Sequence, residues 1–227
     1  FLKKNNPDII LIQELKARDE DIPKEEIENL NYNIISKGQK SYNGVAILSK
    51  YPVSDVFFNL PTYKEDEQAR YIEAWISIEN KGLRVASIYA PNGNPINTDK
   101  YDYKKNWLES FTKEVGKSLK KNKNIVIAGD FNVIPEKIDV YDFTRYENDA
   151  LFKTEIRKKF RELINLGFVD IYRHINKTKQ EYTFWDYMSG SWQKNYGMRI
   201  DHFLVSTNLV NKIQNININK KPRSKLK

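Results

Sequence analysis

The sequence contains no cysteine among its 227 residues. This absence excludes disulfide bonds, thiolate nucleophiles and zinc sites built on cysteine, and it fits a reducing cytoplasm. No apolar run approaches the roughly 18 residues that a membrane-spanning helix needs. No basic segment followed by an apolar one opens the chain, as it would in a secretion signal. We therefore expect a cytoplasmic protein that does not associate with a membrane.

Charge of the two signs is unequal, with 38 basic side chains against 30 acidic ones and a net charge of +8. An excess of positive charge favours anionic partners such as nucleic acid, an anionic membrane or phosphorylated metabolites. A composition rich in lysine and asparagine, following the base content of a genome, explains the excess equally well. Charge alone therefore does not identify DNA as the partner.

Apolar patterning predicts an α/β protein with a real core, since 40% of the residues are hydrophobic. Helical spacing of apolar residues predicts two clear helices, and Gly167 is a natural stop for the second. Strands and helices alternate irregularly, and we see no internal repeat or linker, so we expect mixed sheets. The predicted helices are residues 98–121 and 155–166; the predicted strands are residues 8–14, 44–49, 71–78, 83–89, 124–128, 199–205 and 213–218.

Two of the predicted strands deliver acidic side chains at their ends. Glu14 follows an apolar run, where a carboxylate must be solvated, paired or bound to a metal, and its hard oxygens suit magnesium. Asp130 and Asn132 would point to the same side if strand alternation continues, and could hold a water and a phosphate oxygen together. A solvated strand end paired with Lys16 explains Glu14 about as well. A plain turn explains Asp130 and Asn132.

Polar residues also accompany two other strands. Tyr89 and Asn92 lie at the end of one of them, where a phenol and an amide can donate hydrogen bonds to a phosphate oxygen. A core tyrosine entering a turn is the ordinary interpretation of that segment. Asp201 lies inside an apolar strand and needs a partner, and orienting a histidine is one use for it. His202 should point to the opposite face of the same strand, so we assign it no role.

Several separated segments together resemble the exonuclease III / abasic-site (AP) endonuclease family of the endonuclease/exonuclease/phosphatase superfamily. Each motif is weak alone, but their joint order and spacing are specific, and the likeness covers nearly the whole chain. The resemblance implies a four-layered α/β sandwich, in which two mixed β-sheets pack face to face and are flanked by helices. The matching segments are residues 7–16, 42–49, 89–93, 129–132, 182–187 and 199–205.

The resemblance also implies catalytic roles, residue by residue. Glu14 would bind the catalytic Mg²⁺, for which Mn²⁺ could substitute, and Lys16 would support the metal-binding carboxylates. Asp130 would align or deprotonate the attacking water. Asn132 would hold that water and the phosphate, and Tyr89 would hydrogen-bond the phosphate.

Other matching residues imply contacts with DNA. Tyr42 and Asn92 would touch the DNA backbone, and Asp201 would orient a catalytic histidine. A flipped abasic sugar would enter a small pocket, because a missing base lowers the cost of extruding the nucleotide. The residues lining that pocket would be Phe184, Met198 and Ile200.

The implied activity is magnesium-dependent DNA repair. A monomer would hydrolyse the phosphodiester 5′ to abasic sites in double-stranded DNA, and would also act as a 3′–5′ exonuclease that trims blocked 3′ ends. One alternative is another phosphoesterase of the superfamily, acting on sphingolipid, inositol phosphate or RNA. Two further alternatives are a DNA-binding remnant without catalysis and a gene fragment without function.

The family pattern extends past both ends of this sequence. Its first strand, which ends in an asparagine, would precede Phe1, and its last motif, Ser-Asp-His, would follow Lys227. We therefore expect a single domain over residues 1–227 that lacks both segments. Very weak nuclease activity would follow for these 227 residues, since losing one electrostatic donor costs about 100- to 1000-fold in rate. An incomplete sequence, whose natural protein has both ends, is the simpler explanation.

Overall fold

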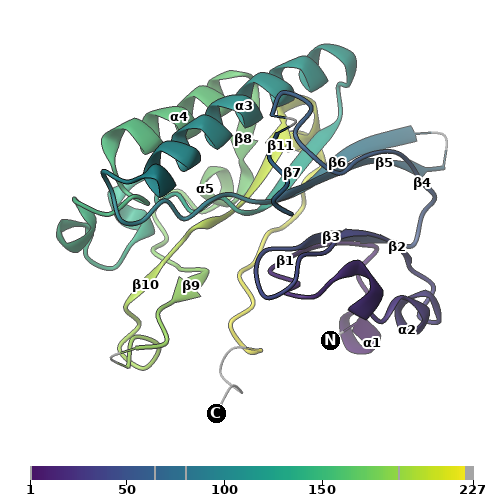
Figure 1. Cartoon of the computed structure of the whole chain (residues 1–227), viewed down its shortest axis with the longest axis horizontal. Helices are drawn as coiled ribbons and strands as arrows, with labels where there is room; N and C mark the ends of the chain where they lie inside the picture. The colour runs from purple at the N-terminus through teal and green to yellow at the C-terminus, as the bar shows by residue number, and fades with distance from the viewer. Residues whose placement is uncertain (1, 64, 80, 189, 223–227) are drawn as a thin grey trace. The chain divides into compact units, whose positions relative to one another are not determined.

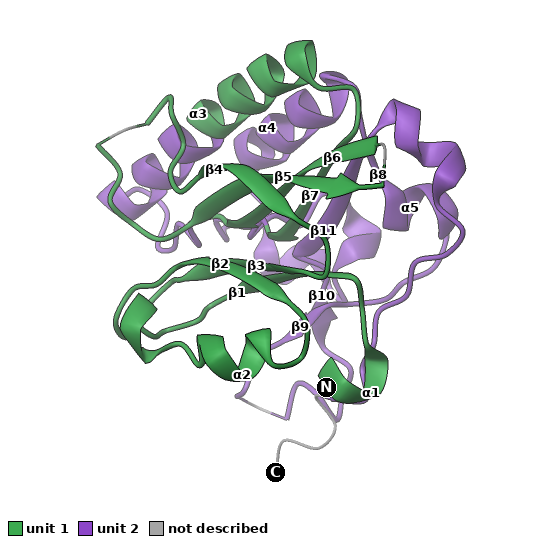
Figure 2. Ribbon diagram, turned by 90° about the vertical axis from the view of Figure 1, so that its right-hand side faces the viewer, with its two compact units in different colours: residues 1–90, 109–130 green, residues 91–108, 131–227 purple. Residues whose placement is uncertain are grey.

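The computed structural model describes residues 2–63, 65–79, 81–188 and 190–222. The chain divides into two compact units: residues 1–90 with 109–130, and residues 91–108 with 131–227, coloured separately in Figure 2. We call them unit 1 and unit 2. Phe1 and residues 223–227, which border the two segments that the family pattern places beyond this sequence, lie outside the described residues. The single domain over residues 1–227 stays a prediction.

Unit 1 contains a three-stranded antiparallel sheet in the order β1-β3-β2. Two short helices lie on its outer side (Figure 1), where side chains from both pack with Tyr32, Ala46 and Leu48. This sheet and its helices form the first two layers of the unit. The elements are α1 (Leu2–Asn5), β1 (Ile9–Gln13), α2 (Lys24–Glu28), β2 (Asn33–Lys37) and β3 (Val45–Ser49).

A second sheet of unit 1 has the strand order β4-β5-β6-β7. Strand β5 pairs antiparallel with both β4 and β6, whereas β6 and β7 are parallel, so this sheet is mixed. The parallel pair matters for the site, because the carboxyl ends of parallel strands lie at one edge. These strands are β4 (Val53–Phe57), β5 (Tyr71–Ile78), β6 (Lys81–Tyr89) and β7 (Ile125–Asp130).

The two sheets of unit 1 pack face to face through the alternating side chains of β5. Ile72 and Ile76 are fully buried against Val45 and Ile47 of β3. Tyr71, on the opposite face of β5, has its ring 6.2 Å from that of Phe111 in helix α3 (Asp99–Lys121). Period-two alternation thus gives one strand contact with both layers. The predicted four-layered α/β architecture is confirmed within unit 1, with the parallel pairing confined to the second sheet.

Unit 2 is built around two strand pairs and two further helices. Strand β11 pairs antiparallel with β8, and β9 pairs antiparallel with β10. Helix α4 buries Ile156, Phe160 and Leu163 at helical spacing. Among the residues that the structure describes, no helix has the length and apolar character of a membrane span. The elements are α4 (Thr154–Asn165), β8 (Phe168–Asp170), α5 (Ile171–Ile175), β9 (Phe184–Trp185), β10 (Gly197–Met198) and β11 (Asp201–Ser206), and α3 begins in this unit.

One predicted strand is wrong. Residues 213–218 carry isoleucine at positions 213, 216 and 218 between polar residues, but they form no strand. The 3-10 helix Thr207–Lys212 ends just before them, and their polar side chains are exposed. Isoleucine favours extended backbone, but a strand also needs the backbone of a neighbour to pair with. The prediction of residues 199–205 is right only from Asp201 onward.

Candidate active site

The ends of β6 and β7 place Tyr89 beside Asp130. The two residues are partners in the parallel register of these strands. The backbone N–H of Ala90 donates to the carbonyl of Asp130 at 2.8 Å, which holds the two strand ends together. A phenol and a carboxylate therefore share one edge of the mixed sheet.

Strand β1 of the other sheet in unit 1 comes to the same edge through its last residue. The amide of Gln13 donates to Ser87 Oγ at 2.8 Å, and this hydroxyl donates to the carbonyl of Ile12 at 3.0 Å. The Gln13 amide also lies close against Gly129, where a Cβ would come within 3.0 Å of Gln13 Nε2 and 2.1 Å of the Ile88 carbonyl. Gly129 is needed for this close approach. Glu14 directly follows Gln13 in the chain and so lies at the same edge.

Glu14 and Asp130 both act on the hydroxyl of Tyr89. Burial, followed by the charges of Glu14 and Asp130 and a hydrogen bond that the hydroxyl donates to Glu14, raises the pKa of Tyr89 well above its usual value. Arg70 lowers it in part; its guanidinium lies 5.1 Å from the centre of the Tyr89 ring. Tyr89 is therefore held protonated, as a hydrogen-bond donor, between two carboxylates.

The Glu14 carboxylate is exposed and paired. Its Oε2 lies 2.6 Å from Lys16 Nζ, and the side chain is 42% exposed. Glu14 and Lys16 both have left-handed backbone, with φ of 56° and 53°. Such non-glycine conformations are uncommon and often accompany functional sites. The ion pair matches both interpretations offered for Glu14, a paired strand end and a metal-binding carboxylate supported by Lys16.

A network of amides holds the segment around Tyr42. The backbone N–H of Lys16 donates to the carbonyl of Asn43, and the buried amide of Asn43 donates to the side-chain oxygens of Gln39 and Gln68. Tyr42 itself is 71% exposed. The residue expected to contact DNA is thus an exposed aromatic ring carried on a fixed loop.

In unit 2, Asn132 and Asn92 lie side by side. Asn92 Nδ2 donates to Asn132 Oδ1 at 3.3 Å, and Asn132 is 4% exposed. Strand β7 ends at Asp130, and Asn132 has a left-handed φ of 50°. The expectation that strand alternation sets the side of Asn132 is therefore wrong, because the chain leaves the strand before reaching it.

Asp201 lies at the first position of β11 and is anchored by Thr183. The backbone N–H groups of Ile200 and Asp201 both donate to Thr183 Oγ1 at 3.1 Å. The carbonyl of Ile200 accepts from Phe131 N at 3.0 Å. This bond joins Phe131 to Ile200, which directly precede Asn132 and Asp201 in the chain. The structure therefore brings Asn132 and Asp201 into the same part of unit 2.

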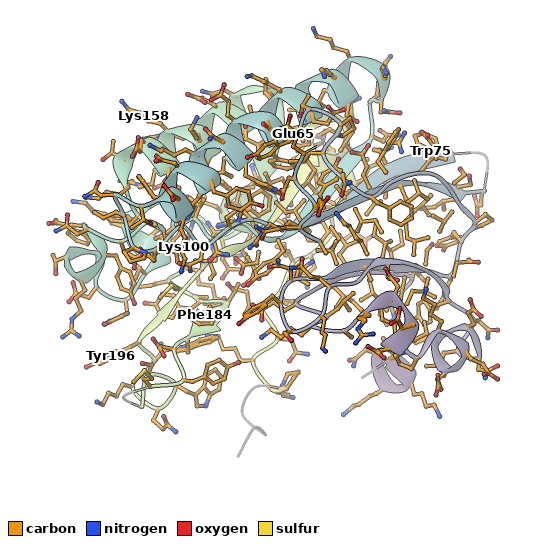
Figure 3. All side chains as sticks on the ribbon, in the orientation of Figure 1. Glu65, Trp75, Lys100, Lys158, Phe184 and Tyr196 are labelled. Carbon is orange, nitrogen blue, oxygen red and sulfur yellow. The ribbon has the colours of Figure 1, made fainter. Side chains whose placement is uncertain are left out.

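The three residues expected to line the abasic pocket gather in one apolar cluster. Met198 and Ile200 are buried at 5% and 4% exposure, and Phe184 packs against them from a partly exposed position. Figure 3 labels Phe184 next to the β9–β10 ribbon of unit 2. Val140, Leu151 and Phe152 belong to the same cluster.

His202 is buried on the opposite side of β11 from Asp201. Its Nε2 lies 2.8 Å from the carbonyl of Val133, and its Nδ1 lies 2.9 Å from Arg199 Nη1. Asp170 pairs with Arg199 at 2.8 Å. These contacts make His202 part of a buried ion network of the core.

The donor chemistry fits a sparsely coordinated hard cation. Among the described residues, no group of three or more acidic or histidine side chains is arranged to hold a metal ion. Magnesium usually keeps several waters and takes only one or two protein carboxylates, with phosphate oxygens as further ligands. The exposed carboxylate of Glu14, with Asp130 near the same tyrosine, suits that kind of site.

Two residues that contact predicted site residues, one in each unit, were missed by the sequence interpretation. Arg70 contacts Tyr89 through its charge and donates to its carbonyl at 3.2 Å, but no motif marks it. Lys104 is fully buried and donates to the carbonyls of Asn92 and Asn132. A signal for Lys104 existed: it lies three and four residues before the buried Trp107 and Leu108, on the apolar stripe of the predicted helix.

Comparison with known proteins identifies the family. The sequence model described as the Endonuclease/Exonuclease/phosphatase family matches residues 1–215. The chain belongs to this family.

Within the family, the chain is similar to nucleases of the exonuclease III and AP endonuclease branch. It is 32% identical to a Haemophilus influenzae protein named exodeoxyribonuclease III, over 96% of this chain and 85% of that protein. It is also 32% identical to a DNA-(apurinic or apyrimidinic site) endonuclease of Dictyostelium discoideum, over 94% of this chain. The matched region spans only 59% of the Dictyostelium protein.

Solved structures of this branch have the same fold. A 3′ phosphatase from Neisseria, solved with a product DNA hairpin, superposes with a TM-score of 0.95 at 32% identity, over 100% of this chain and 86% of that one. An AP endonuclease from Archaeoglobus fulgidus gives a TM-score of 0.92 at 34% identity, over 98% of this chain and 85% of that one. The expected membership and fold are therefore confirmed.

Proposed function

We propose that this protein is a magnesium-dependent nuclease that hydrolyses the phosphodiester 5′ to abasic sites in double-stranded DNA. As a monomer it would also trim blocked 3′ ends in the 3′–5′ direction. The observation that carries the proposal is the placement of Tyr89 opposite Asp130 in the parallel register of β6 and β7, with its hydroxyl donating to Glu14, which directly follows β1. The similarity of the chain to proteins named exodeoxyribonuclease III and AP endonuclease supports it.

Tyr89 would hydrogen-bond a phosphate oxygen. A phosphodiester under attack gains negative charge on its oxygens, and a fixed donor stabilises that charge. Because the pKa of Tyr89 is raised, first by burial and then by the two carboxylates, its hydroxyl keeps its proton at neutral and mildly alkaline pH. It can therefore donate throughout the working range of the enzyme.

Asp130 would align the attacking water and accept its proton. A carboxylate is an acceptor only, so it can orient a water O–H away from the phosphorus and leave the oxygen lone pair directed at it. Asn132 would hold the same water and the phosphate by hydrogen bonds. Asp201 would orient a catalytic histidine.

Glu14 would hold the Mg²⁺, with Lys16 supporting its carboxylate. The bound ion would supply positive charge that offsets the charge developing on the phosphate and its leaving oxygen. Mn²⁺, which also prefers oxygen ligands, could take its place.

Lesion choice would come from the apolar cluster of Phe184, Met198 and Ile200. A sugar without a base is small and apolar on one side, and it costs less to extrude from the duplex than a paired nucleotide. Tyr42 and Asn92 would contact the DNA backbone, where contacts set position and give salt-dependent affinity.

The test is cleavage of a duplex oligonucleotide carrying one abasic site, using the protein expressed from its complete reading frame. We expect an Mg²⁺-dependent nick on the 5′ side of the lesion. Glu14→Gln should lower the rate constant at fixed Mg²⁺ by about 100-fold or more, on the scale of losing one electrostatic group.

Glu20→Gln is the matched control, because Glu20 is also an exposed carboxylate paired with a basic side chain two residues away, Arg18. It should leave the rate unchanged. Hydrolysis of a sphingolipid, inositol phosphate or RNA substrate in place of the abasic duplex would overturn the proposal in favour of another branch of the family. Salt-sensitive binding without Mg²⁺-dependent product would overturn it in favour of a non-catalytic DNA-binding protein.

A further inference from the structure

Lys104 of α3 is the most completely buried cation of the described residues, with an exposed fraction of 0%. All three N–H bonds of its ammonium group have main-chain acceptors. Nζ donates to the carbonyls of Asn132 at 2.6 Å, Asn92 at 2.9 Å and Ala150 at 3.1 Å. Burying an ammonium is costly, so the fold must gain something specific from it.

The three carbonyls come from loops that are far apart in sequence, and two of them belong to residues of the candidate site. Lys104 itself stands on a helix that runs from Asp99 to Lys121. A single side chain of a rigid element thus fixes the main chain at both Asn92 and Asn132. The stem of Lys104 contributes too, because a Cβ at Gly93 would come within 2.5 Å of its Cδ.

The hydrogen bonds around Asn92 fix the orientation of the side-chain amides of Asn92 and Asn132. Asn92 Oδ1 accepts from the backbone N–H of Asn94 at 3.1 Å, so its Nδ2 is the group that faces Asn132. That Nδ2 donates to Asn132 Oδ1. Because Asn132 Oδ1 is the acceptor of this bond, Nδ2 is the donor end of the Asn132 amide.

Asn94 links this arrangement to the third carbonyl. Its Oδ1 accepts from the backbone N–H of Ala150 at 2.9 Å, and its Nδ2 donates to Asp149 at 3.0 Å. The 92–94 loop and the 149–150 segment are therefore tied to one another and to Lys104. Loss of the ammonium would free three carbonyls at once and leave the two asparagine amides on loops with fewer anchors.

We propose that Lys104 is a positioning residue for phosphodiester hydrolysis: its ammonium holds the main chain of Asn92 and Asn132 so that the Asn132 amide presents its donor end to the phosphate. This inference rests on the function proposed for the site. It predicts a defect in the catalytic step, since a misplaced donor stabilises the transition state less well while the DNA contacts elsewhere remain.

Lys104→Met tests this, because methionine keeps much of the side-chain length and removes the donors. With abasic duplex as substrate and below the thermal transition of the variant, kcat should fall about 10- to 100-fold, while KM changes by less than about 3-fold. Lys104→Arg, which keeps a charged donor in place, should recover part of the lost kcat. The matched control is Lys105→Met, since Lys105 is partly exposed and paired with Asp102.

A second readout does not depend on activity. The side-chain amide resonances of Asn92 and Asn132, recorded by NMR with isotope-labelled protein, should shift and broaden in Lys104→Met and stay in place in Lys105→Met. A merely structural role would lower the thermal midpoint in proportion to the lost activity, leave those resonances unchanged in the folded protein and give no recovery with arginine. That result would overturn the inference.

The two proposals can fail separately. If the wild-type protein does not cleave abasic DNA, the proposed function fails, and the amide resonances still report whether Lys104 positions the two asparagines. If the wild type cleaves and the folded Lys104→Met variant keeps a normal kcat, only the role of Lys104 is overturned.

Discussion

Tyr89 illustrates how the surroundings of one side chain select its chemistry. A free phenol loses its proton near pH 10, and between two carboxylates in a half-buried position it holds that proton more tightly. Burial is the largest cause, followed by Glu14 and Asp130, and Arg70 opposes them only in part. The site therefore contains a neutral donor directly beside two groups that serve as anionic acceptors.

Replacing Tyr89 with phenylalanine should lower kcat/KM on abasic DNA about 100-fold, the scale of losing one transition-state donor. Because the raised pKa keeps the hydroxyl protonated, the loss should be the same at pH 7 and at pH 9. Steady-state kinetics at both values checks this. A wild-type profile that falls between pH 8 and 9.5, with the fall absent from Tyr89→Phe, would contradict it.

Tyr32→Phe is the control for a lost tyrosine hydroxyl. The Tyr32 hydroxyl donates to the carbonyl of Pro7, on the side of the first sheet that packs against α1 and α2. Its loss should cost about 1 kcal/mol of stability, the usual worth of such a bond. It should leave kcat/KM unchanged.

At the residue scale, sequence reasoning found the groups that stand at strand ends and missed those that support them. Glu14, Tyr89 and Asp130 are recognisable because a polar residue that closes an apolar run needs a reason to be there. Arg70 reaches Tyr89 by a tertiary contact that no local pattern encodes. Lys104 did leave a trace, as a charge on the apolar stripe of a helix, but its acceptors are main-chain carbonyls that have no sequence signature.

At the element scale, long periodic segments were predictable and short ones were not. The alternation of residues 71–78 matches β5 over its whole length, and the apolar stripe of residues 98–121 matches α3 within one residue. Strands β9 and β10 have two residues each and exist through their pairing with one another. Residues 213–218 show the reverse case, an isoleucine-rich segment that forms no strand.

Strand β7 depends on Gly129 at the place where it approaches β1. Its φ of +143° lies outside the range that other residues readily adopt, and a Cβ would meet the Ile88 carbonyl at 2.1 Å. Gly129→Ala should therefore cost about 2–4 kcal/mol, combining backbone strain with steric overlap. The free energy of unfolding from urea titration measures this.

Gly167→Ala separates the two contributions. Gly167 also has a positive φ, +119°, but a Cβ there would meet nothing within 4 Å. Backbone strain alone should cost it about 1 kcal/mol. Equal losses in the two variants would show that the close approach of Gln13 and Ile88 to Gly129 is not what requires glycine.

At the scale of the whole molecule, each unit buries its own ion network, and the two respond to acid in opposite directions. In unit 1, Arg84 Nε lies 3.1 Å from Glu73, and burial is the main reason that the pKa of Glu73 is raised. In unit 2, burial opposes ionisation of Asp170. The nearby His202, whose Nδ1 lies 3.7 Å from Asp170, and the charge of Arg199 at 2.8 Å outweigh it, so the pKa of Asp170 lies well below its usual value.

The signs of the two contributions follow from linkage. A depressed pKa means that Asp170 stabilises the fold above its ordinary value of about 4, and that this stabilisation is lost as the pH falls below it. A raised pKa means that ionised Glu73 costs stability at neutral pH. That cost is relieved as the pH falls towards the ordinary glutamate value of about 4.3. Mild acid should thus favour unit 1 while stronger acid weakens unit 2.

Two variants should change this acid response in opposite ways. Asp170→Asn should be less stable than the wild type at pH 7 but lose less stability between pH 4.5 and pH 3, because the titrating group of unit 2 is gone. Glu73→Gln should remove the gain that the wild type shows between pH 7 and pH 4.5. Urea midpoints at pH 7, 4.5 and 3 test both.

Hydrogen exchange read by mass spectrometry should show residues 131–222 losing protection before residues 2–90 as the pH falls to 3. Simultaneous loss in both segments, with all three proteins following the same curve, would mean that these networks do not govern the acid limit of the fold.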